Sequence, residues 1–278
     1  MRKDSIRFID KRTPLYEGAK KIVFDGNDYN TSLLYFKDSW PIADDAPQTI
    51  PEKGVINNAL SSYIFEKLNV YGLQTHHILK QNGREQLVQN LEMIPAHIHI
   101  YNVAPPHVAK PLGLSEGVLL PTAVVDWFVK DDQKTKSMMN PQHFEALGIV
   151  SSDEVNDINT MALRVNHFLT GFYAALGLQL NEVYLRFGRR YNEIIDDTEI
   201  MLGDEISLDT CFIVDILTNK KLGFAGIDRE VPDSQHCYRD FLSRCPFDLL
   251  SSGSNPLPSN ADVVNLKANI KEAAHNGH

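Results

Sequence analysis

Two short segments carry residue types that could bind a nucleotide and its metal ion. Residues 16–21 read Y-E-G-A-K-K, and glycine beside lysine lets backbone N–H and ammonium groups approach a phosphate closely. Residues 203–209 bring together Asp204, Glu205 and Asp209, and carboxylate oxygens are the ligands that Mg²⁺ prefers when it also bridges to phosphates. Taken alone, each segment fits an ordinary solvated turn at least as well. Both interpretations therefore stay open until the rest of the chain is considered.

Two histidine pairs and the cysteines give no comparable signal. His76 and His77 are adjacent, and His97 and His99 would share one face of a strand, but neither pair has a cysteine or carboxylate at a metal-site spacing. The three cysteines form no C-x-x-C pair, and the apolar neighbours of Cys211 indicate a buried structural thiol. We expect neither a zinc site nor a disulfide framework, and a reducing compartment.

Composition favours a globular protein that binds small molecules. The 278 residues are 43% apolar, which is enough to bury a substantial core. Their formal net charge is -9, whereas proteins that bind nucleic acid or anionic membranes have basic surfaces, so we expect neither partner. Residues 1–14 contain no apolar signal-peptide core, and the longest apolar stretch, residues 117–129, is interrupted by Pro121 and Asp126. We predict a cytoplasmic protein.

The elements that would position the first segment form an antiparallel sheet with one helix. Two apolar runs flank D-G-N-D at residues 25–28, which is a hairpin signal. Apolar residues recur at three- and four-residue spacing over residues 55–68 and stop before Gly72, so this stretch predicts an amphipathic helix. Strand patterns resume at residues 77–79 and 87–88. Residues 1–94 are predicted to form a small N-terminal sheet domain.

A larger α+β region is predicted to carry the acidic segment. Asn140-Pro141 begins a short helix, and S-S-D-E at residues 151–154 has the form of a capping box ahead of a helix that closes at Gly177. Strand-like runs cover residues 97–100, 183–187, 194–201 and 211–217, and a mixed helical segment surrounds residues 238–250. The predicted fold class is α+β, with a central and C-terminal region at 95–250 and a mobile, linker-like tail at 251–278.

Seven short segments, taken in order, resemble the SAICAR synthetase family. They are Y-E-G-A-K-K (residues 16–21), K-G-V-I-N-N (53–58), T-H (75–76), G-R-E-Q-L (83–87), E-M-I-P (92–95), R-V-N-x-F-L (164–169) and G-D-E-I-S-x-D (203–209). The order and spacing hold over about residues 14–229. The resemblance implies a SAICAR synthetase-like, ATP-grasp-related fold, in which ATP lies between the N-terminal sheet domain and the larger central domain.

The same resemblance implies a reaction and a set of site residues. In this family ATP activates the carboxylate of an imidazole ribotide as an acyl phosphate, which the amine of aspartate then attacks. ATP and Mg²⁺ are the implied cofactors, and a homo-oligomer is expected. The implied nucleotide-binding residues are Gly18, Lys20, Lys21, Glu92, Met93 and Glu182, and the implied metal ligands are Asp204 and Glu205. The substrate-pocket candidates are Tyr101, Asn102, His107, Tyr184, Arg186 and Asp209.

This sequence departs from the family pattern where substrate anions would bind. Cations of the pattern correspond here to Ala19, Tyr101, Pro111, Tyr184 and Phe212, an acidic position corresponds to Arg186, and D-D-P corresponds to T-K-S at residues 135–137. Losing even two charge-assisted hydrogen bonds to the substrate costs about 3 to 6 kcal/mol. That cost corresponds to a rate lower by roughly a hundredfold to ten-thousandfold.

Three functions remain open at this point. We predict a nucleotide-binding protein with weak or lost SAICAR synthetase activity and an accessory or regulatory role toward a protein partner. One alternative is an active ATP-dependent ligase for another acid or amine, whose pocket Tyr101, His107, Tyr184 and Arg186 would line. The other alternative is a SAICAR synthetase with compensating residues. No catalytic residue is assigned.

Overall fold

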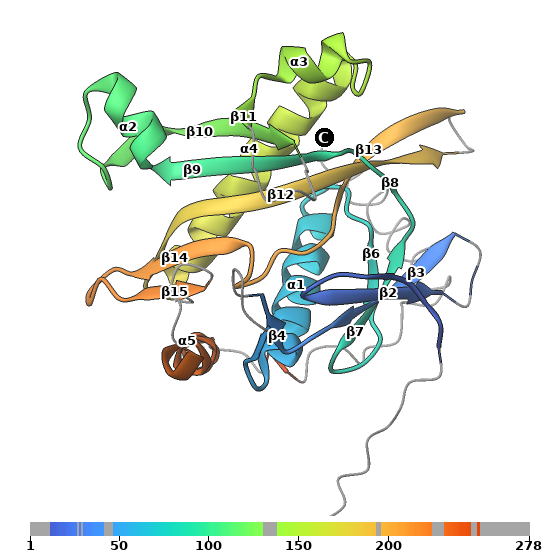
Figure 1. Cartoon of the computed structure of the whole chain (residues 1–278), viewed down its shortest axis with the longest axis horizontal. Coiled ribbons are helices and arrows are strands. Elements are labelled where there is room, and N and C mark those ends of the chain that lie inside the picture. Colours follow the sequence, from blue (N-terminus) through green and yellow to red (C-terminus); the bar gives the residue numbers. More distant parts are fainter. Residues whose placement is uncertain are drawn as a thin grey trace, which may run out of the picture.

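The structure is a computed structural model that describes residues 12–26, 28, 30–41, 47–129, 138–192, 196–223, 231–245 and 249–250. The predicted mobile tail at 251–278 and the T-K-S segment at 135–137 lie outside these residues. Two large antiparallel sheets, the helix α1 and further helices make up the described chain (Figure 1). The fold is α+β, as the sequence predicts.

The N-terminal sheet has the strand order β1-β2-β3-β7-β6, and every neighbouring pair in it is antiparallel. Its strands are β1 (Pro14–Glu17), β2 (Lys21–Asp25), β3 (Thr31–Phe36), β6 (His77–Lys80) and β7 (Glu85–Gln89). The predicted hairpin is confirmed, because Asp25 of β2 pairs with Ser32 of β3 across the D-G-N-D turn. A separate two-stranded sheet joins β4 (Ser39–Trp40) to β5 (Gln48–Thr49).

Helix α1 (Lys53–Val70) lies against β3, β6 and β7. Its predicted end is confirmed, since Tyr71 is the C-cap and Gly72 follows with φ of 74°. The prediction of an amphipathic helix is wrong, because α1 buries polar side chains as well as apolar ones. These polar side chains are Lys53, Asn57, Asn58, Ser61 and Ser62. Buried polar groups need hydrogen-bond partners, so this face of α1 points to a polar site.

The central sheet has the strand order β11-β10-β9-β12-β14-β15, and β8 and β13 also pair with β12. Its strands are β8 (Glu92–Met93), β9 (Ala96–Val103), β10 (Leu119–Val129), β11 (Met138–Met139), β12 (Leu178–Asn192), β13 (Asp197–Gly203), β14 (Cys211–Asp215) and β15 (Lys221–Gly223). The predicted strand at 211–217 is too long. Asp215 Oδ1 accepts hydrogen bonds from the backbone N–H groups of Leu217 and Thr218, at 2.9 and 2.6 Å, and these bonds turn the chain.

Helix α4 (Ser152–Ala175) packs on the central sheet (Figure 1). The predicted capping box is confirmed: Ser151 Oγ accepts from the Glu154 N–H at 3.2 Å, and Glu154 Oε2 accepts from the Ser151 N–H at 2.8 Å. The other helices are α2 (Pro106–Leu112), α3 (Pro141–Ala146) and α5 (Val231–Arg244). Thus α5 begins earlier than the predicted helical segment at 238–250, and the patterns predicted neither β10 nor α2.

One apolar core connects α1, α4, α5 and the central sheet. Its members include Ile64, Trp127, Leu169, Leu185 and Phe241, each with 1% of its surface exposed or less. Cys211 is also buried, as predicted, and burial raises the pKa of its thiol to about 12. Among the described residues, no helix is both long and apolar enough to cross a membrane.

Lowering the pH from 7 to 5 is expected to destabilise the protein by about 2 kcal/mol through His77 alone. Burial, with a smaller effect of His76, lowers the pKa of His77 to about 3. The unfolded chain binds a proton below about pH 6.5 that the folded chain excludes. The stability from neutral His77 is therefore complete above that pH and falls as the pH drops toward 3.

Urea unfolding of the wild type and of His77→Phe at both pH values measures this effect. The variant should lose about 2 kcal/mol less than the wild type between pH 7 and pH 5. His236→Phe, on an exposed position of α5, is the control and should behave like the wild type. Equal losses in the wild type and in His77→Phe would contradict the assignment.

Candidate active site

A cavity of about 690 Å³ lies between the N-terminal sheet and the β12–β13 side of the central sheet. We call it the inter-sheet cavity. Its walls come from the β1–β2 turn, from β2, β3, β7 and β12, and from the loop that follows β13. The predicted residues that line it are Gly18, Lys20, Lys21, Met93, Tyr184, Arg186, Asp204, Glu205 and Asp209. The basic and acidic segments, about 185 residues apart in sequence, therefore share one cavity.

Lys21 connects the basic turn to the acidic loop. Its ammonium group forms ion pairs with Asp204 and with Glu205, the latter at 2.9 Å between Nζ and Oε1. Arg186 Nη1 lies 3.4 Å from Asp204 Oδ2. Although burial opposes the charged forms, these pairings raise the pKa of Lys21 and lower the pKa of Asp204. Both groups are therefore charged at neutral pH.

Asp204 also has a constrained backbone. Its φ of 62° lies in the left-handed region, which few residues other than glycine adopt and which often occurs at functional sites. Its carbonyl oxygen lies 3.1 Å from His76 Nε2. Burial lowers the pKa of His76 to about 4, so its ring is neutral at pH 7. The backbone and side chain of Asp204 are thus both held in place.

A second network surrounds the buried carboxylate of Asp209. Lys53 Nζ lies 2.6 Å and Lys20 Nζ lies 3.7 Å from Asp209 Oδ2. Asn57 Nδ2 donates to Asp209 Oδ1 at 2.8 Å, and the Tyr238 hydroxyl donates to the same oxygen. Burial raises the pKa of Asp209, but Lys53 and Lys20 outweigh it and hold the pKa below its usual range. Asp209 therefore carries a negative charge that holds Lys20, which lines the cavity, and Lys53, which is buried.

Lys20 is the more adaptable of the two cavity lysines. Its Nζ lies 4.1 Å from the centroid of the Trp40 ring, in a cation–π contact, and its side chain is 29% exposed. Burial lowers its pKa, and Asp209 opposes that shift. An ammonium group with one distant carboxylate and an open side can take an anionic ligand without breaking a close ion pair.

Three residues that complete this network were missed by the sequence reasoning. Lys53 and Asn57 lie near the start of α1, and Tyr238 lies in α5. All three contact Asp209. A partial signal existed, because Lys53 and Asn57 belong to the K-G-V-I-N-N segment quoted above. No sequence signal pointed to Tyr238, whose contact with Asp209 depends on the packing of α5.

The central sheet holds a cluster of neutral aromatic groups beside the cavity, which we call the aromatic wall and of which Tyr184 lines the cavity. The His99 ring stacks on Tyr184 with 3.8 Å between ring centroids, and its centroid lies 4.2 Å from that of Phe128. His99 Nδ1 is 3.2 Å from the Tyr101 hydroxyl and 3.3 Å from Glu182 Oε1. Burial, followed by Glu182, raises the pKa of both Tyr101 and Tyr184, so both phenols stay protonated and neutral.

The remaining predicted residues do not line the inter-sheet cavity. Glu92 is exposed and pairs with Arg189 at 3.3 Å, although its neighbour Met93 does line the cavity. Glu182 instead contacts the aromatic wall, where it lies near His99 and Tyr184. Asn102 exchanges hydrogen bonds of 2.9 and 2.8 Å with Asn166 of α4, and His107 Nε2 lies 3.1 Å from Asp126 Oδ2. Tyr101 is buried, with its ring 5.2 Å from His107.

The donor set at the cavity suits a hard divalent cation. Asp204 and Glu205 both present carboxylate oxygens to the cavity, and these are the ligands that Mg²⁺ prefers. Lys21 lies between the two carboxylates, and Ser207 Oγ donates to Glu205 Oε2 at 2.6 Å. Among the described residues, the ion-pair partner of Asp204 Oδ2 is Arg186, at 3.4 Å. Because each carboxylate oxygen has more than one lone pair, both carboxylates could still offer oxygens to a cation that also binds phosphate oxygens.

Comparison with known proteins covers the fold and the part of the chain that holds the cavity residues. The SAICAR synthetase family description matches residues 14–243, which include both sheets, α1 and the cavity residues. The chain belongs to the SAICAR synthetase family. The resemblance drawn from the seven segments is therefore confirmed, and it extends past residue 229 into α5.

SAICAR synthetase relatives match the chain over most of its length. The phosphoribosylaminoimidazole-succinocarboxamide synthase of Novosphingobium aromaticivorans is 35% identical over 264 residues, which cover 95% of this chain and 98% of that protein. The synthase of Phenylobacterium zucineum is 37% identical over 235 residues, which cover 84% and 93%. These relatives support an active synthase, the alternative above, better than the predicted loss of activity.

Solved SAICAR synthetase structures share the fold. The synthase of Ehrlichia chaffeensis superposes with a TM-score of 0.77 at 29% identity, covering 84% of this chain and 98% of that one. A SAICAR synthetase in complex with ADP superposes with a TM-score of 0.74 at 32% identity, covering 82% and 96%. The α+β fold predicted from the sequence is thus the fold of this family.

Proposed function

We propose that this protein is an ATP-dependent SAICAR synthetase, which joins the carboxylate of an imidazole ribotide to the amine of aspartate. The observation that carries the proposal is the inter-sheet cavity, where Lys20 and Lys21 meet Asp204, Glu205 and Asp209. Relatives that carry the synthase name, and a family member in complex with ADP, support it. A cytoplasmic location and a homo-oligomer remain predictions.

Lys20 and Lys21 would neutralise the nucleotide phosphates during transfer. A carboxylate oxygen of the ribotide attacks the γ-phosphorus, ADP leaves, and an acyl phosphate forms. Positioning and charge neutralisation dominate such a transfer, and both ammonium groups face the cavity. Gly18, at the same turn, has no side chain to keep phosphate oxygens from the backbone. Mg²⁺, held by Asp204 and Glu205, would supply further positive charge to the phosphates.

The acceptor side of the cavity is shaped by Arg186, Tyr184 and His97. The aspartate nitrogen attacks the acyl carbon, phosphate leaves, and the nitrogen loses a proton. Arg186, which has only the 3.4 Å contact to Asp204 among its described ion pairs, can turn to an anionic substrate group. The Tyr184 phenol, kept neutral by burial and Glu182, donates one hydrogen bond.

A second candidate function is the same ligation with a different acid or amine. Tyr184, which lines the cavity and which burial and Glu182 keep neutral, favours it, because this group bears no fixed positive charge. A neutral phenol at the cavity suits a less anionic acid than a ribotide phosphate. The predicted regulatory role would require the same nucleotide site with no turnover.

Mg-ATP is expected to raise the melting temperature by roughly 5 to 10 °C. A ligand at 100 times its Kd stabilises a protein by about 2.7 kcal/mol, and each kcal/mol shifts the melting temperature by about 2 to 4 °C at this size. Differential scanning fluorimetry with Mg²⁺ alone as the control measures the shift. An unchanged melting temperature at millimolar Mg-ATP would contradict the proposal that this protein binds a nucleotide.

An ADP-release assay then separates the candidate functions. ADP release that requires both the carboxylated imidazole ribotide and aspartate is the expected result. ADP release only with another acid or amine would favour the second candidate. Nucleotide binding without ADP release for any pair would contradict both ligase functions and favour the regulatory role.

A further inference from the structure

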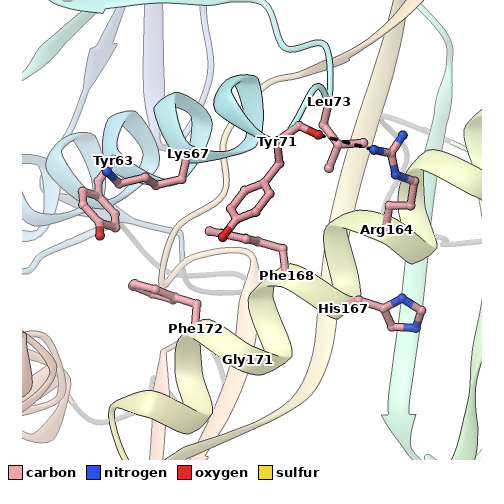
Figure 2. A pocket seen from close by; sticks show the side chains of 9 residues that line it. All are labelled: Tyr63, Lys67, Tyr71, Leu73, Arg164, His167, Phe168, Gly171 and Phe172. Atoms are coloured by element: carbon pink, nitrogen blue, oxygen red, sulfur yellow. Dashed lines mark hydrogen bonds between the residues drawn. The ribbon is translucent and has the colours of Figure 1, made fainter. Parts of the chain in front are cut away.

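A second cavity, of about 820 Å³, lies between the C-terminal half of α1 and the middle of α4 (Figure 2). We call it the α1–α4 groove. It shares no lining residue with the inter-sheet cavity. Arg164 and Phe168, two of its lining residues, belong to the R-V-N-x-F-L segment of the family resemblance. The proposed reaction gives that exposed part of the segment no role.

A strip of aromatic rings forms one side of this groove. The rings of Phe168 and Phe172 are nearly parallel, at 9°, with 6.3 Å between centroids. Tyr71 extends the strip at one end, 5.5 Å from Phe168, and Tyr63 extends it at the other, 5.9 Å from Phe172. Tyr71 is 66% exposed. The strip therefore offers ring faces and edges to a flat apolar ligand.

Gly171 leaves open space beside the strip. A Cβ atom built at this position meets no heavy atom within 4 Å. Glycine inside a helix costs about 0.5 to 1 kcal/mol relative to alanine, and neither backbone geometry nor close packing requires it at this position of α4. Its effect in this groove is to keep the surface between Phe168 and Phe172 uncovered.

Two cations stand at the ends of the aromatic strip. At one end, Lys67 Nζ lies 5.2 Å from the centroid of the Tyr63 ring. At the other end, Arg164 Nη2 donates a hydrogen bond of 3.4 Å to the carbonyl oxygen of Tyr71 (Figure 2). Neither cation forms an ion pair with a carboxylate in the part of the chain that the structure describes. The neighbouring Glu66 carboxylate interacts with Lys67 only electrostatically, and cations beside rings complement an anionic ligand.

We propose that the α1–α4 groove is a second ligand site, for a planar aromatic ring that carries a phosphate or carboxylate group. The ring lies along Phe168 and Phe172 over Gly171, and the anionic group binds Lys67 or Arg164. An aliphatic anion would leave the ring faces unused, and a neutral aromatic compound would leave the cations unused. The site is separate from the nucleotide site in residues and in position.

AMP is the probe for this proposal. With the inter-sheet cavity saturated by Mg-ADP, AMP at about 1 mM or below should slow hydrogen exchange of the backbone amides in residues 60–73 and 160–173. In the double variant Lys67→Glu with Arg164→Glu, the AMP concentration that gives half-maximal protection should be at least tenfold higher. Lys110→Glu is the control: it also replaces a cation with a carboxylate, but at an exposed position of α2 away from the groove. This variant should show the same protection by AMP as the wild type.

A glycine pair tests the shape of the groove. Gly171→Leu fills the open space and should abolish the protection by AMP, whereas Gly171→Ala adds only a methyl group and should retain it. Both variants should still bind Mg-ADP, so failure of the nucleotide site and failure of the groove are distinguishable. Absence of AMP protection in the wild type would overturn the proposal.

Two further results would also overturn it. Inorganic phosphate should protect the same amides only weakly, because it has no ring to bind the aromatic strip, so equal protection by phosphate at the same concentration would show that the rings take no part. Sedimentation velocity tests a second copy of the chain as the occupant. A dimer that Gly171→Leu dissociates while Gly171→Ala preserves it would show that the groove is a subunit interface.

Discussion

Replacement of Lys21 with methionine is expected to lower turnover by at least a hundredfold. Lys21 lines the inter-sheet cavity, and its ammonium group forms ion pairs with both Asp204 and Glu205. The distance from Lys21 Nζ to Glu205 Oε1 is 2.9 Å. Methionine has a similar length but no charge. Removing one fixed group that stabilises a developing anion typically costs about 2.7 to 4 kcal/mol, or a factor of 10² to 10³.

ADP release at saturating substrates, and ADP affinity by titration calorimetry, measure this effect. Lys21→Arg keeps the charge and should retain more turnover than Lys21→Met. Lys110→Met, on exposed α2, is the matched control and should equal the wild type. Lys21→Met also removes the ion pairs with Asp204 and Glu205 and is expected to lower the melting temperature. Assays well below that temperature therefore separate the loss of turnover from unfolding. Turnover of Lys21→Met within tenfold of the wild type would contradict the role.

Local sequence signals predicted the elements that position the site. The D-G-N-D turn joins β2 to β3, Ser151 and Glu154 cap α4, and Gly72 follows α1, each as predicted. These features depend on a few adjacent residues, whose backbone preferences are legible in one sequence. The basic and acidic segments were also found, because glycine, lysine and carboxylates at short spacing indicate phosphate and metal chemistry.

Contacts between distant segments could not be predicted from those signals. His99 was considered as one member of a histidine pair, whereas its ring lies between Tyr184 and Phe128 of neighbouring strands. That stack depends on the pairing of β9 with both β10 and β12. The α1–α4 groove likewise joins residues about a hundred positions apart. Spacing along one strand or helix carries no information about such partners.

The buried face of α1 shows how this limit affected the site. The sequence predicted an amphipathic helix over residues 55–68, yet Asn57 within that stretch and Lys53 just before it are 1% exposed and bind Asp209. A buried lysine needs a carboxylate, but the sequence offers many acidic residues and does not select one. The fold makes that selection by bringing the loop after β13 over the start of α1.

Replacement of Asp209 with alanine is expected to destabilise the folded protein by about 3 to 5 kcal/mol. The substitution leaves Lys53 buried without the ion pair that it forms among the described residues, and it removes an acceptor from Asn57 and Tyr238. An uncompensated buried charge is among the largest single-site penalties in a folded chain. Unfolding in urea at pH 7 measures the loss.

A double-mutant cycle with Lys53→Met separates the ion pair from the rest of the network. If the buried lysine causes most of the penalty, Asp209→Ala with Lys53→Met should be more stable than Asp209→Ala alone, by about 1 to 3 kcal/mol. Arg239→Ala is the control, because it removes an ion pair with Glu52 in which both side chains are 56% exposed. It should lower the free energy of unfolding by less than about 1 kcal/mol.

The pH dependence provides an independent check on Asp209. Its pKa in the folded protein is below the value of about 3.9 expected in the unfolded chain, because Lys53 and Lys20 outweigh burial. The unfolded state therefore binds a proton first as the pH falls. The stabilisation is complete above about pH 4 and is lost below it, so the difference in stability between wild type and Asp209→Ala should narrow from pH 5 to pH 3. A difference that stays constant or widens over that range would show that Asp209 does not act as a charged partner of Lys53.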